Sequence, residues 1–299
     1  MPGPVHRGSR SRTGPGNRLL VGARRLGTLP PVSDQPVHDL VIVGGGNMGA
    51  ALLGGLLASG SFVDNADLAV VEAVAARRAE LADLFPGVVI APELPPCRGA
   101  VLAVKPPDVP AAATAAAAAG ATRILSIAAG VSTATIERAT GDGVSVVRAM
   151  PNTPALVGEG ASAIAPGSAA GDDDLAWAAD VLGAVGLVVR VDERQLDAIT
   201  ALTGSGPAYL FLVAEALNDA GVACGLSPEL TEQMTTQLFV GAAKLLAERG
   251  DPAALRTMVT SPGGTTAAGL GVLDDRKVRA AFVAAVQAAA ARSAELGAE

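Results

Sequence analysis

Three glycines with a fixed spacing are the first residues of this 299-residue chain that point to a chemistry. Gly44, Gly46 and Gly49 fit a G-x-G-x-x-G pattern and directly follow the apolar run of residues 40–43. In that pattern the first glycine allows a tight turn, the second lets backbone approach a pyrophosphate, and the third lets the next helix pack closely on the strand. Because the pattern lies between a buried strand and an apolar helix, it favours a dinucleotide site over a structural turn.

A second motif combines glycine with hydroxyl side chains in residues 259–266. Two glycines and several hydroxyl groups before a predicted helix form a concavity of backbone N–H groups that suits a carboxylate. A capped helix with a glycine-rich start is the alternative interpretation. Residues 200–208 are also rich in glycine, and there the motif could equally be a tight turn between two helices.

The elements that position these motifs alternate along the first part of the chain. Strands are predicted at 67–71, 88–91, 100–104, 123–128, 144–148, 161–165 and 187–191, with helices at 47–59, 73–85, 110–120, 132–139 and 172–184. This alternation is typical of a parallel sheet with crossover helices. Lys105 follows one of these strands, at the carboxyl end where open α/β sheets bind ligands, although a lysine at a strand end is also common without a function.

After residue 191 the apolar pattern becomes helical. Ser205 and Pro207 are expected to start a helix that runs to Ala220, and further helices are expected from Ser227 to Ala247, after Asp251, and over the last 20 or so residues. The predicted fold class is therefore α/β, with a Rossmann-type dinucleotide-binding domain over residues 37–191 followed by an all-helical domain over residues 192–299. Residues 1–36 are rich in Arg, Gly and Pro, and we expect them to form a disordered extension.

The choice between the two nicotinamide dinucleotides stays open in the sequence. Glu72 ends the second predicted strand, near the position where a Rossmann fold places the acid that binds a ribose 2′-hydroxyl, and this favours NADH. Arg77 and Arg78 follow closely and could pair with the 2′-phosphate of NADPH. On a helix, however, they are expected to be solvated surface charges.

Composition excludes several classes of function. The net charge is −7 and the pI is about 4.9, which argues against nucleic acid as a partner. Cys97 and Cys224 are far apart, so we expect no disulfide framework, no cysteine metal site and a cytoplasmic location. We also expect no membrane crossing, since no apolar run of about 18 residues stands out.

The missing side chains restrict the reaction. Both histidines, His6 and His38, precede the predicted fold, Tyr209 has no lysine four residues later, and no ligand set for catalytic zinc is present. A reductase with this sequence must therefore act without a strong protein acid. An imine meets that condition, because a protonated imine accepts hydride directly and positioning carries most of the catalysis.

Five motifs together resemble the pyrroline-5-carboxylate reductase family. They occur in that family's order over residues 39–297, and they are Gly44-Gly-Gly-Asn-Met48, Ala103-Val-Lys-Pro106, Arg148-Ala-Met-Pro-Asn-Thr-Pro154, Thr203-Gly-Ser-Gly-Pro-Ala-Tyr209 and Thr260-Ser-Pro-Gly-Gly-Thr-Thr266. The resemblance implies hydride transfer from NADPH or NADH to 1-pyrroline-5-carboxylate, giving L-proline in the last step of proline biosynthesis. It also implies a homodimer, often within a decamer, with the site between one subunit's nucleotide domain and its partner's helices.

The resemblance also implies roles for individual residues. The pyrophosphate would contact Gly44, Gly46, Asn47 and Met48; the nicotinamide would be bordered by Val104, Lys105 and Pro106; and the substrate carboxylate would be held by Ser261, Gly263, Gly264 and Thr265. Thr266 would hydrogen-bond the ring nitrogen and relay its proton. No metal is implied.

Three features depart from the family pattern. They are the long segment before Val37, Leu238 where threonine is usual, and Glu72 where a small hydroxyl residue often lies near an adenosine 2′-phosphate. The last puts the family's usual preference for NADPH in question. The alternatives to this activity are a reductase of another cyclic imine or imino acid and a non-catalytic nucleotide-binding regulatory protein. The intact segment from Ser261 to Thr266 argues against the second, because a protein that only binds nucleotide does not need a carboxylate pocket.

Overall fold

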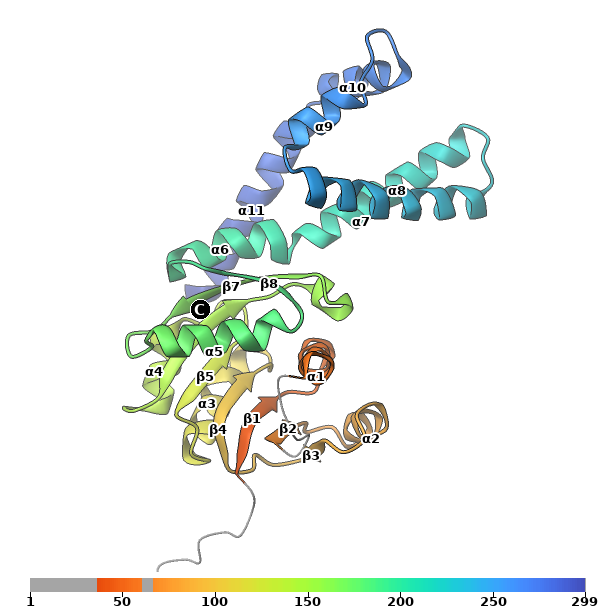
Figure 1. Ribbon diagram of the computed structural model, residues 1–299. Coiled ribbons are helices and arrows are strands. Elements are labelled where there is room, and N and C mark those ends of the chain that lie inside the picture. Colours follow the sequence, from red (N-terminus) through yellow and green to blue (C-terminus); the bar gives the residue numbers. More distant parts are fainter. Residues whose placement is uncertain (1–36, 61–66, 299) are drawn as a thin grey trace, which may run out of the picture. The chain divides into compact units, whose positions relative to one another are not determined.

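One sheet organises the first two thirds of the protein (Figure 1). The computed structural model describes residues 37–60 and 67–298, so the extension expected over residues 1–36 lies outside the described residues. The strand order is β3-β2-β1-β4-β5-β6-β7-β8. The strands are β1 (His38–Val43), β2 (Leu68–Val71), β3 (Val89–Ala91), β4 (Cys97–Leu102), β5 (Arg123–Ser126), β6 (Ser145–Met150), β7 (Gly160–Pro166) and β8 (Gly186–Arg190).

The strands from β1 to β6 run parallel, as the alternation of strands and helices predicted. β1 pairs with β2 on one side and with β4 on the other, which places the carboxyl ends of these strands at one edge. β7 pairs antiparallel with β6, an orientation that the sequence did not predict. The two are joined only by a short 3₁₀ helix, η3 (Thr153–Val157), and a parallel pair would need a longer crossover.

Helices cover both faces of the sheet because neighbouring residues of each strand point to opposite sides. Leu40 and Ile42 of β1 pack in one buried cluster with α1 (Asn47–Ser59), α2 (Ala75–Leu84) and α5 (Asp172–Gly183). Val41 and Val43 pack in a second cluster with α3 (Val109–Ala118) and α4 (Thr133–Thr140). These clusters hold β1 and α1 in place and so fix the glycine loop between them. The bounds of α1 match the predicted range, 47–59.

The helix that follows the sheet is longer than predicted. It runs without a break from Glu193 to Ala223 through η4 (Glu193–Gln195), α6 (Leu196–Ile199), the π-helical η5 (Thr200–Gly204) and α7 (Gly206–Ala223). α7 starts directly after Ser205, as predicted, with Pro207 in its first turn. The Ser205 side chain makes no cap hydrogen bond, however, and its N–H donates to the Thr200 carbonyl at 2.8 Å, which joins α7 to the π-helical turn before it. Gly221 does not end α7 either. A side chain there would clash with Thr231, so the glycine allows α8 (Pro228–Arg249) to pack closely.

Three more helices complete the chain: α9 (Pro252–Met258), α10 (Thr265–Asp275) and α11 (Val278–Ala298). Ser227 and Asp251 cap α8 and α9 with side-chain hydrogen bonds, as expected from the sequence. The carboxyl-terminal part of α11 returns to α6, where the Ser293 hydroxyl donates to the Asp197 carboxylate at 2.7 Å. In the described part of the chain, all elements after Arg190 are helical. This order of elements is consistent with a domain boundary near residue 191, which stays a prediction.

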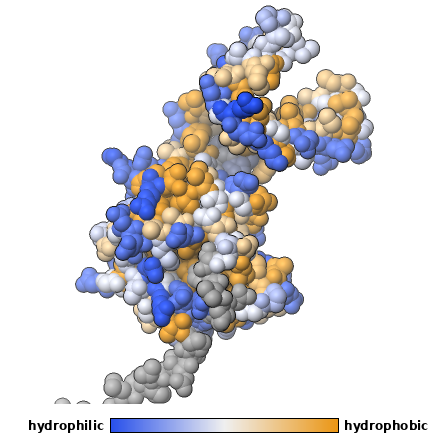
Figure 2. Space-filling model, in the orientation of Figure 1, coloured by the Kyte–Doolittle hydropathy of each residue, from blue (hydrophilic) through white to orange (hydrophobic). Residues whose placement is uncertain are grey.

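Helix α7 buries none of its residues in a single chain. Figure 2 shows apolar side chains, in orange, along the helices as well as over the sheet. The large exposed apolar residues of these helices include Leu210, Phe211, Leu212, Met234, Leu238, Val272, Leu273 and Val283, and Phe211 is 64% exposed. Apolar faces of this size mark a contact surface.

The expectation that no apolar run could cross a membrane needs correction. In the described part of the chain, the helical run Glu193–Ala223 is long and apolar enough by length and composition, and few of its residues are buried. The same test is met by a helix whose apolar face packs in an interface between subunits. A single such helix is weak support for a membrane span.

Candidate active site

The glycine loop is shaped by two close contacts. Gly44 has a φ of +112°, and a Cβ there would lie 2.5 Å from the Ala103 carbonyl oxygen. A Cβ on Gly49 would clash with the Gly44 carbonyl, so the third glycine allows α1 to start against the loop. These contacts confirm the structural reasons predicted for both residues.

Gly46 has a different role, because nothing lies within 4 Å of a Cβ placed on it. It is the N-cap of α1, and no side chain caps this helix end. The N–H groups of the first turn therefore face open space, where the helix dipole favours an anion. Asn47 is exposed beside them, whereas the Met48 side chain packs partly against the core, which leaves its backbone N–H for a ligand. An open cradle above an uncapped helix end fits a pyrophosphate.

Val104, Lys105 and Pro106 lie beside this loop. The Ala103 N–H donates to the Val43 carbonyl at 2.8 Å, and a Cβ on Gly44 would lie 3.2 Å from the Val104 nitrogen. The structure thus brings the end of β4 against the glycine loop. Lys105 is exposed and precedes a short 3₁₀ helix, η2 (Pro106–Asp108).

Glu72 directly follows the adjacent strand, β2, and faces the same loop. Its carboxylate accepts hydrogen bonds from the Gly45 N–H at 3.0 Å and from the Val74 N–H at 2.8 Å. Arg77 donates to the Gly45 carbonyl, so the prediction of a solvated surface charge is wrong for this residue. It is wrong for Arg78 too, which donates to the carbonyls of Glu72 and Ala73.

Asn152, at the end of β6, joins the sheet to the helices. Its side-chain N–H₂ donates to the Thr203 carbonyl at 3.0 Å, and its oxygen accepts from the Ala161 N–H at 2.8 Å. Thr203 belongs to the π-helical turn, a feature often found at functional sites. A groove of about 410 Å³ opens beside this contact, lined by Asn152, Pro154, Leu202, Pro207, Tyr209, Phe282 and other residues. In the sequence, Asn152 appeared only as part of the Arg148–Pro154 motif, without a role of its own.

We expect Asn152→Leu to lower the free energy of unfolding by about 1–3 kcal/mol, because it leaves the partly buried Thr203 carbonyl and Ala161 N–H without this partner. Chemical denaturation of the folded protein measures this. Ser162→Ala, on the neighbouring strand β7, is the matched control, since the Ser162 hydroxyl is buried without a hydrogen-bond partner in the described part of the chain. The control is expected to be neutral, and an equal loss in both variants would contradict the role of Asn152.

A second link joins the start of the helical part to the sheet. The Glu193 carboxylate accepts hydrogen bonds from the Thr133 N–H at 2.8 Å and from the Thr133 hydroxyl at 2.7 Å, and it pairs with the buried Arg148 guanidinium at 3.1 Å. Burial alone would raise the pKa of Glu193, but the hydrogen bonds from Thr133 and the pair with Arg148 outweigh it and hold the pKa below the ordinary 4.5. We did not single out Glu193 from the sequence, although a buried arginine on β6 signals a nearby anion.

This lowered pKa predicts a stability difference that depends on pH. A depressed pKa in the folded state stabilises the protein above the ordinary value of 4.5, and this stabilisation is lost as the pH falls through the lower folded value. Glu193→Gln should therefore unfold at a lower temperature than the wild type at pH 7, and the gap should narrow below pH 4.5. Asp83→Asn, which removes an exposed carboxylate on α2, is the control and should show no such convergence.

The second sequence motif lies far from the glycine loop within one chain. Gly263 has a φ of +67°, Gly264 is the N-cap of α10, and no side chain caps that helix. α10 packs on α11, whose other end reaches α6 beside the sheet (Figure 1). The 21 residues of α11 span about 30 Å at 1.5 Å per residue, and α10 lies at the end of this helix away from the sheet (Figure 1). Ser261–Thr266 and the glycine loop therefore do not meet within one chain.

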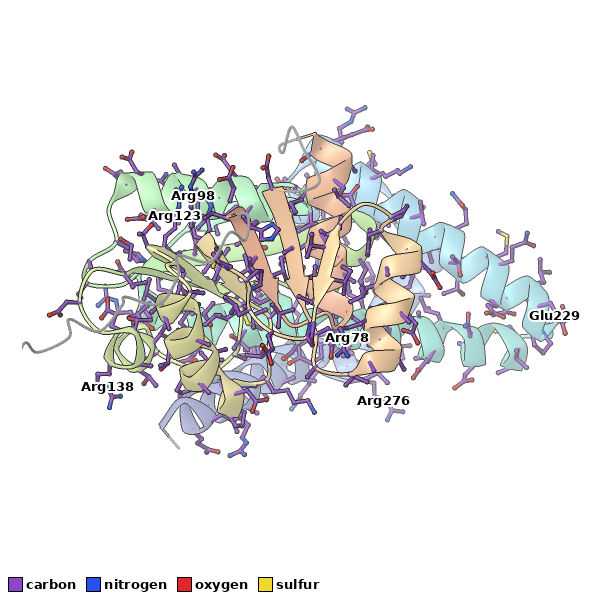
Figure 3. The ribbon with its side chains drawn as sticks, turned by 90° about the horizontal axis from the view of Figure 1, so that it is seen from below. Arg78, Arg98, Arg123, Arg138, Glu229 and Arg276 are labelled. Carbon is purple, nitrogen blue, oxygen red and sulfur yellow. The ribbon has the colours of Figure 1, made fainter. Side chains whose placement is uncertain are left out.

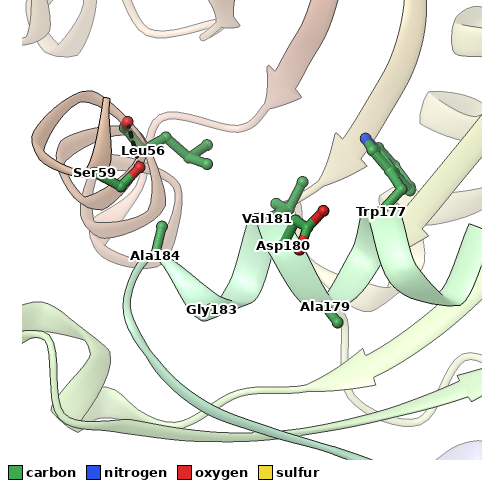
Figure 4. A pocket seen from close by; sticks show the side chains of 8 residues that line it. All are labelled: Leu56, Ser59, Trp177, Ala179, Asp180, Val181, Gly183 and Ala184. Carbon is green, nitrogen blue, oxygen red and sulfur yellow. Dashed lines mark hydrogen bonds between the residues drawn. The ribbon is translucent and has the colours of Figure 1, made fainter. Parts of the chain in front are cut away.

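A depression of about 480 Å³ lies between α1 and α5, away from the residues proposed to bind dinucleotide or carboxylate (Figure 4). Trp177 and Asp180 line it, and the Ser59 hydroxyl there donates to the Leu56 carbonyl at 2.9 Å. None of its lining residues belongs to the motifs described above. We assign no function to this surface.

Comparisons with known proteins agree with a nucleotide-binding part followed by a helical part. Residues 193–296 match the family described as pyrroline-5-carboxylate reductase dimerisation, and residues 39–130 match the one described as NADP oxidoreductase, coenzyme F420-dependent. A pyrroline-5-carboxylate reductase of Mycobacterium leprae is 41% identical over 86% of this chain and 96% of its own. The chain belongs to the pyrroline-5-carboxylate reductase family. A Synechocystis member is 42% identical over 87% of this chain and 98% of its own.

Solved structures of this family share the fold. The pyrroline-5-carboxylate reductase of Coxiella burnetii has a TM-score of 0.80 and 34% identity, over 87% of this chain and 99% of that one. The Plasmodium falciparum pyrroline carboxylate reductase, solved with NADP bound, has a TM-score of 0.75 and 28% identity, over 87% and 98%. The Rossmann-type fold and the helical dimerisation domain are thus confirmed, and the helical part mediates self-association.

Proposed function

We propose that this protein reduces 1-pyrroline-5-carboxylate to L-proline with NADPH or NADH, the last step of proline biosynthesis. The observation that carries the proposal is the pair of uncapped helix ends, one behind the glycine loop and one behind Ser261–Thr266. The first suits a pyrophosphate and the second a carboxylate. Family membership supports pairing them in a single reaction.

The nucleotide-binding part holds the dinucleotide through backbone. The N–H groups of Gly46, Asn47 and Met48 face the open cradle, while Gly44 makes the turn that shapes it. Val104, Lys105 and Pro106 would border the nicotinamide, because the end of β4 lies against Gly44. The reduced nicotinamide of the bound dinucleotide supplies the hydride.

The helical part holds the substrate. The backbone of Gly263, Gly264 and Thr265, with the Ser261 hydroxyl, binds the carboxylate and fixes the orientation of the ring. Thr266, in the first turn of α10, donates a hydrogen bond to the ring nitrogen and relays a proton to it. A protonated imine needs no stronger acid, which agrees with both histidines lying outside this set of residues. The expectation that His38 precedes the fold is wrong, because it is the buried first residue of β1, but the glycine loop follows the other end of that strand.

The two half-sites must come from different subunits. Within one chain α10 lies at the end of α11 away from the sheet, and the apolar faces of α7, α8, α10 and α11 are exposed. A homodimer that covers these faces brings the α10 motif of one copy to the glycine loop of the other. Decamers built from such dimers, and a cytoplasmic location that suits two unpaired cysteines, are part of the same proposal.

The decisive assay follows nicotinamide absorbance while purified protein is mixed with pyrroline-5-carboxylate. Turnover to proline supports the assignment. If folded, dimeric protein turns over a six-membered cyclic imine but not pyrroline-5-carboxylate, the activity belongs to a related imine reductase. Dinucleotide binding without turnover of any cyclic imine would support a regulatory protein instead.

A further inference from the structure

Glu72, the residue directly after β2, carries a carboxylate whose position is fixed by hydrogen bonds within the protein. The two hydrogen bonds from Gly45 and Val74 hold Glu72 against the glycine loop. A Rossmann fold places an acid at this point to accept hydrogen bonds from the ribose hydroxyls of a dinucleotide. An oxygen held in place by the protein loses little entropy on binding, so Glu72 is ready to accept a 2′-hydroxyl.

The nearest guanidinium groups are already engaged. Arg77 donates through Nε to the Gly45 carbonyl at 2.8 Å and pairs with Glu80 at 2.9 Å. Arg78, on α2, donates to the carbonyls of Glu72 and Ala73, each at 2.8 Å. Figure 3 shows Arg78 at the end of the sheet opposite Arg98 and Arg123. Recruiting either group to a 2′-phosphate would cost hydrogen bonds that shape the loop itself.

The residues between Glu72 and Arg77 have no side chain that could donate a hydrogen bond to a 2′-phosphate. Residues 73–76 are Ala, Val, Ala and Ala, all exposed, and the N-cap residue Val74 makes no side-chain cap. A 2′-phosphate would stand with about two negative charges beside the Glu72 carboxylate, without a free cation or hydroxyl group from these residues. Like charges at this range repel, and partial burial weakens the screening by solvent.

We propose that Glu72 determines the dinucleotide preference and that this protein binds NADH more tightly than NADPH. The inference rests on the proposed function, since it takes the glycine loop to be the dinucleotide site. One solved relative has NADP bound, so a preference for NADH would be a property of this chain's own residues and not of the family as a whole. In this chain the charge and the hydrogen bonds around Glu72 favour the cofactor that lacks the phosphate.

The test is equilibrium binding of NADH and NADPH to the full chain, followed by nicotinamide fluorescence without substrate. We expect the wild type to bind NADH at least about tenfold more tightly, which corresponds to about 1.4 kcal/mol. Glu72→Gln keeps the shape and one acceptor while removing the charge, and it should reduce that ratio to about threefold or less. Glu72→Ser should favour NADPH. Asp83→Asn removes a carboxylate elsewhere on α2 and should keep the wild-type ratio.

The outcomes are distinguishable. Tighter NADPH binding by the wild type would overturn the preference, and an unchanged ratio in folded Glu72→Gln and Glu72→Ser would overturn the role of Glu72. If neither dinucleotide binds, the proposed function fails and this inference fails with it. Binding of both with equal affinity overturns the inference and leaves the proposed function standing.

Discussion

Gly46→Asp is expected to weaken the binding of NADH and NADPH by at least about 100-fold, or about 2.7 kcal/mol. The new carboxylate would lie in the open cradle, accept the N–H groups of the first turn of α1 and repel a pyrophosphate. The fold should be kept, because no atom lies within 4 Å of the new Cβ and aspartate is a good N-cap. Isothermal titration with each dinucleotide measures the loss.

Gly171→Asp is the matched control for this substitution. Gly171 is also an N-cap glycine with extended backbone and open space around it, at the start of α5. We expect the control to keep its affinity for both dinucleotides and its thermal stability. Wild-type affinity in Gly46→Asp would show that the dinucleotide does not use this helix end.

Thr266→Ala is expected to lower kcat by about 100-fold, or about 2–3 kcal/mol of barrier, if its hydroxyl bonds the ring nitrogen mainly in the transition state. The affinity for dinucleotide should not change, because Thr266 belongs to the substrate half-site. Steady-state kinetics with saturating cofactor, together with binding titrations, separate the two effects.

Thr266→Ser tests whether the hydroxyl is responsible. It keeps the donor and loses only a methyl group, so we expect it to recover most of the kcat that Thr266→Ala loses. Steady-state kinetics of Thr266→Ala that match the wild type would remove Thr266 from the mechanism. Equal losses in both variants would point to packing at the start of α10 rather than to proton transfer.

The parts of the fold that depend on local sequence were predictable. The apolar run of β1, the glycine spacing and the bounds of α1 follow from burial and from backbone sterics, and both close contacts of Gly44 and Gly49 agree with the roles expected for them. The N-caps Ser227 and Asp251 were also predictable, because an N-cap depends on residues within one turn.

Features that depend on distant contacts could not be predicted in this way. Glycine and proline in residues 204–207 indicated a turn, yet the helix continues there through a π-helical turn that Asn152 holds from the end of β6. Arg77 and Arg78 looked like surface charges because their carbonyl partners lie in loops that only the folded sheet brings near. The roles assigned to Ser261–Thr266 rest on resemblance, since one chain alone does not join them to the glycine loop.

The most direct test of a site shared between subunits is complementation between two inactive variants. Gly46→Asp and Thr266→Ala are coexpressed with different tags, and hybrid oligomers are isolated and assayed with pyrroline-5-carboxylate. Each hybrid dimer then contains one site with an intact glycine loop and an intact Thr266. The account therefore predicts about half of wild-type activity for isolated hybrid dimers. The unfractionated mixture should recover about one quarter, because about half of the dimers are hybrids when assembly is random. If hybrid oligomers form but remain as inactive as the two parents, both half-sites lie in one subunit and the account is wrong.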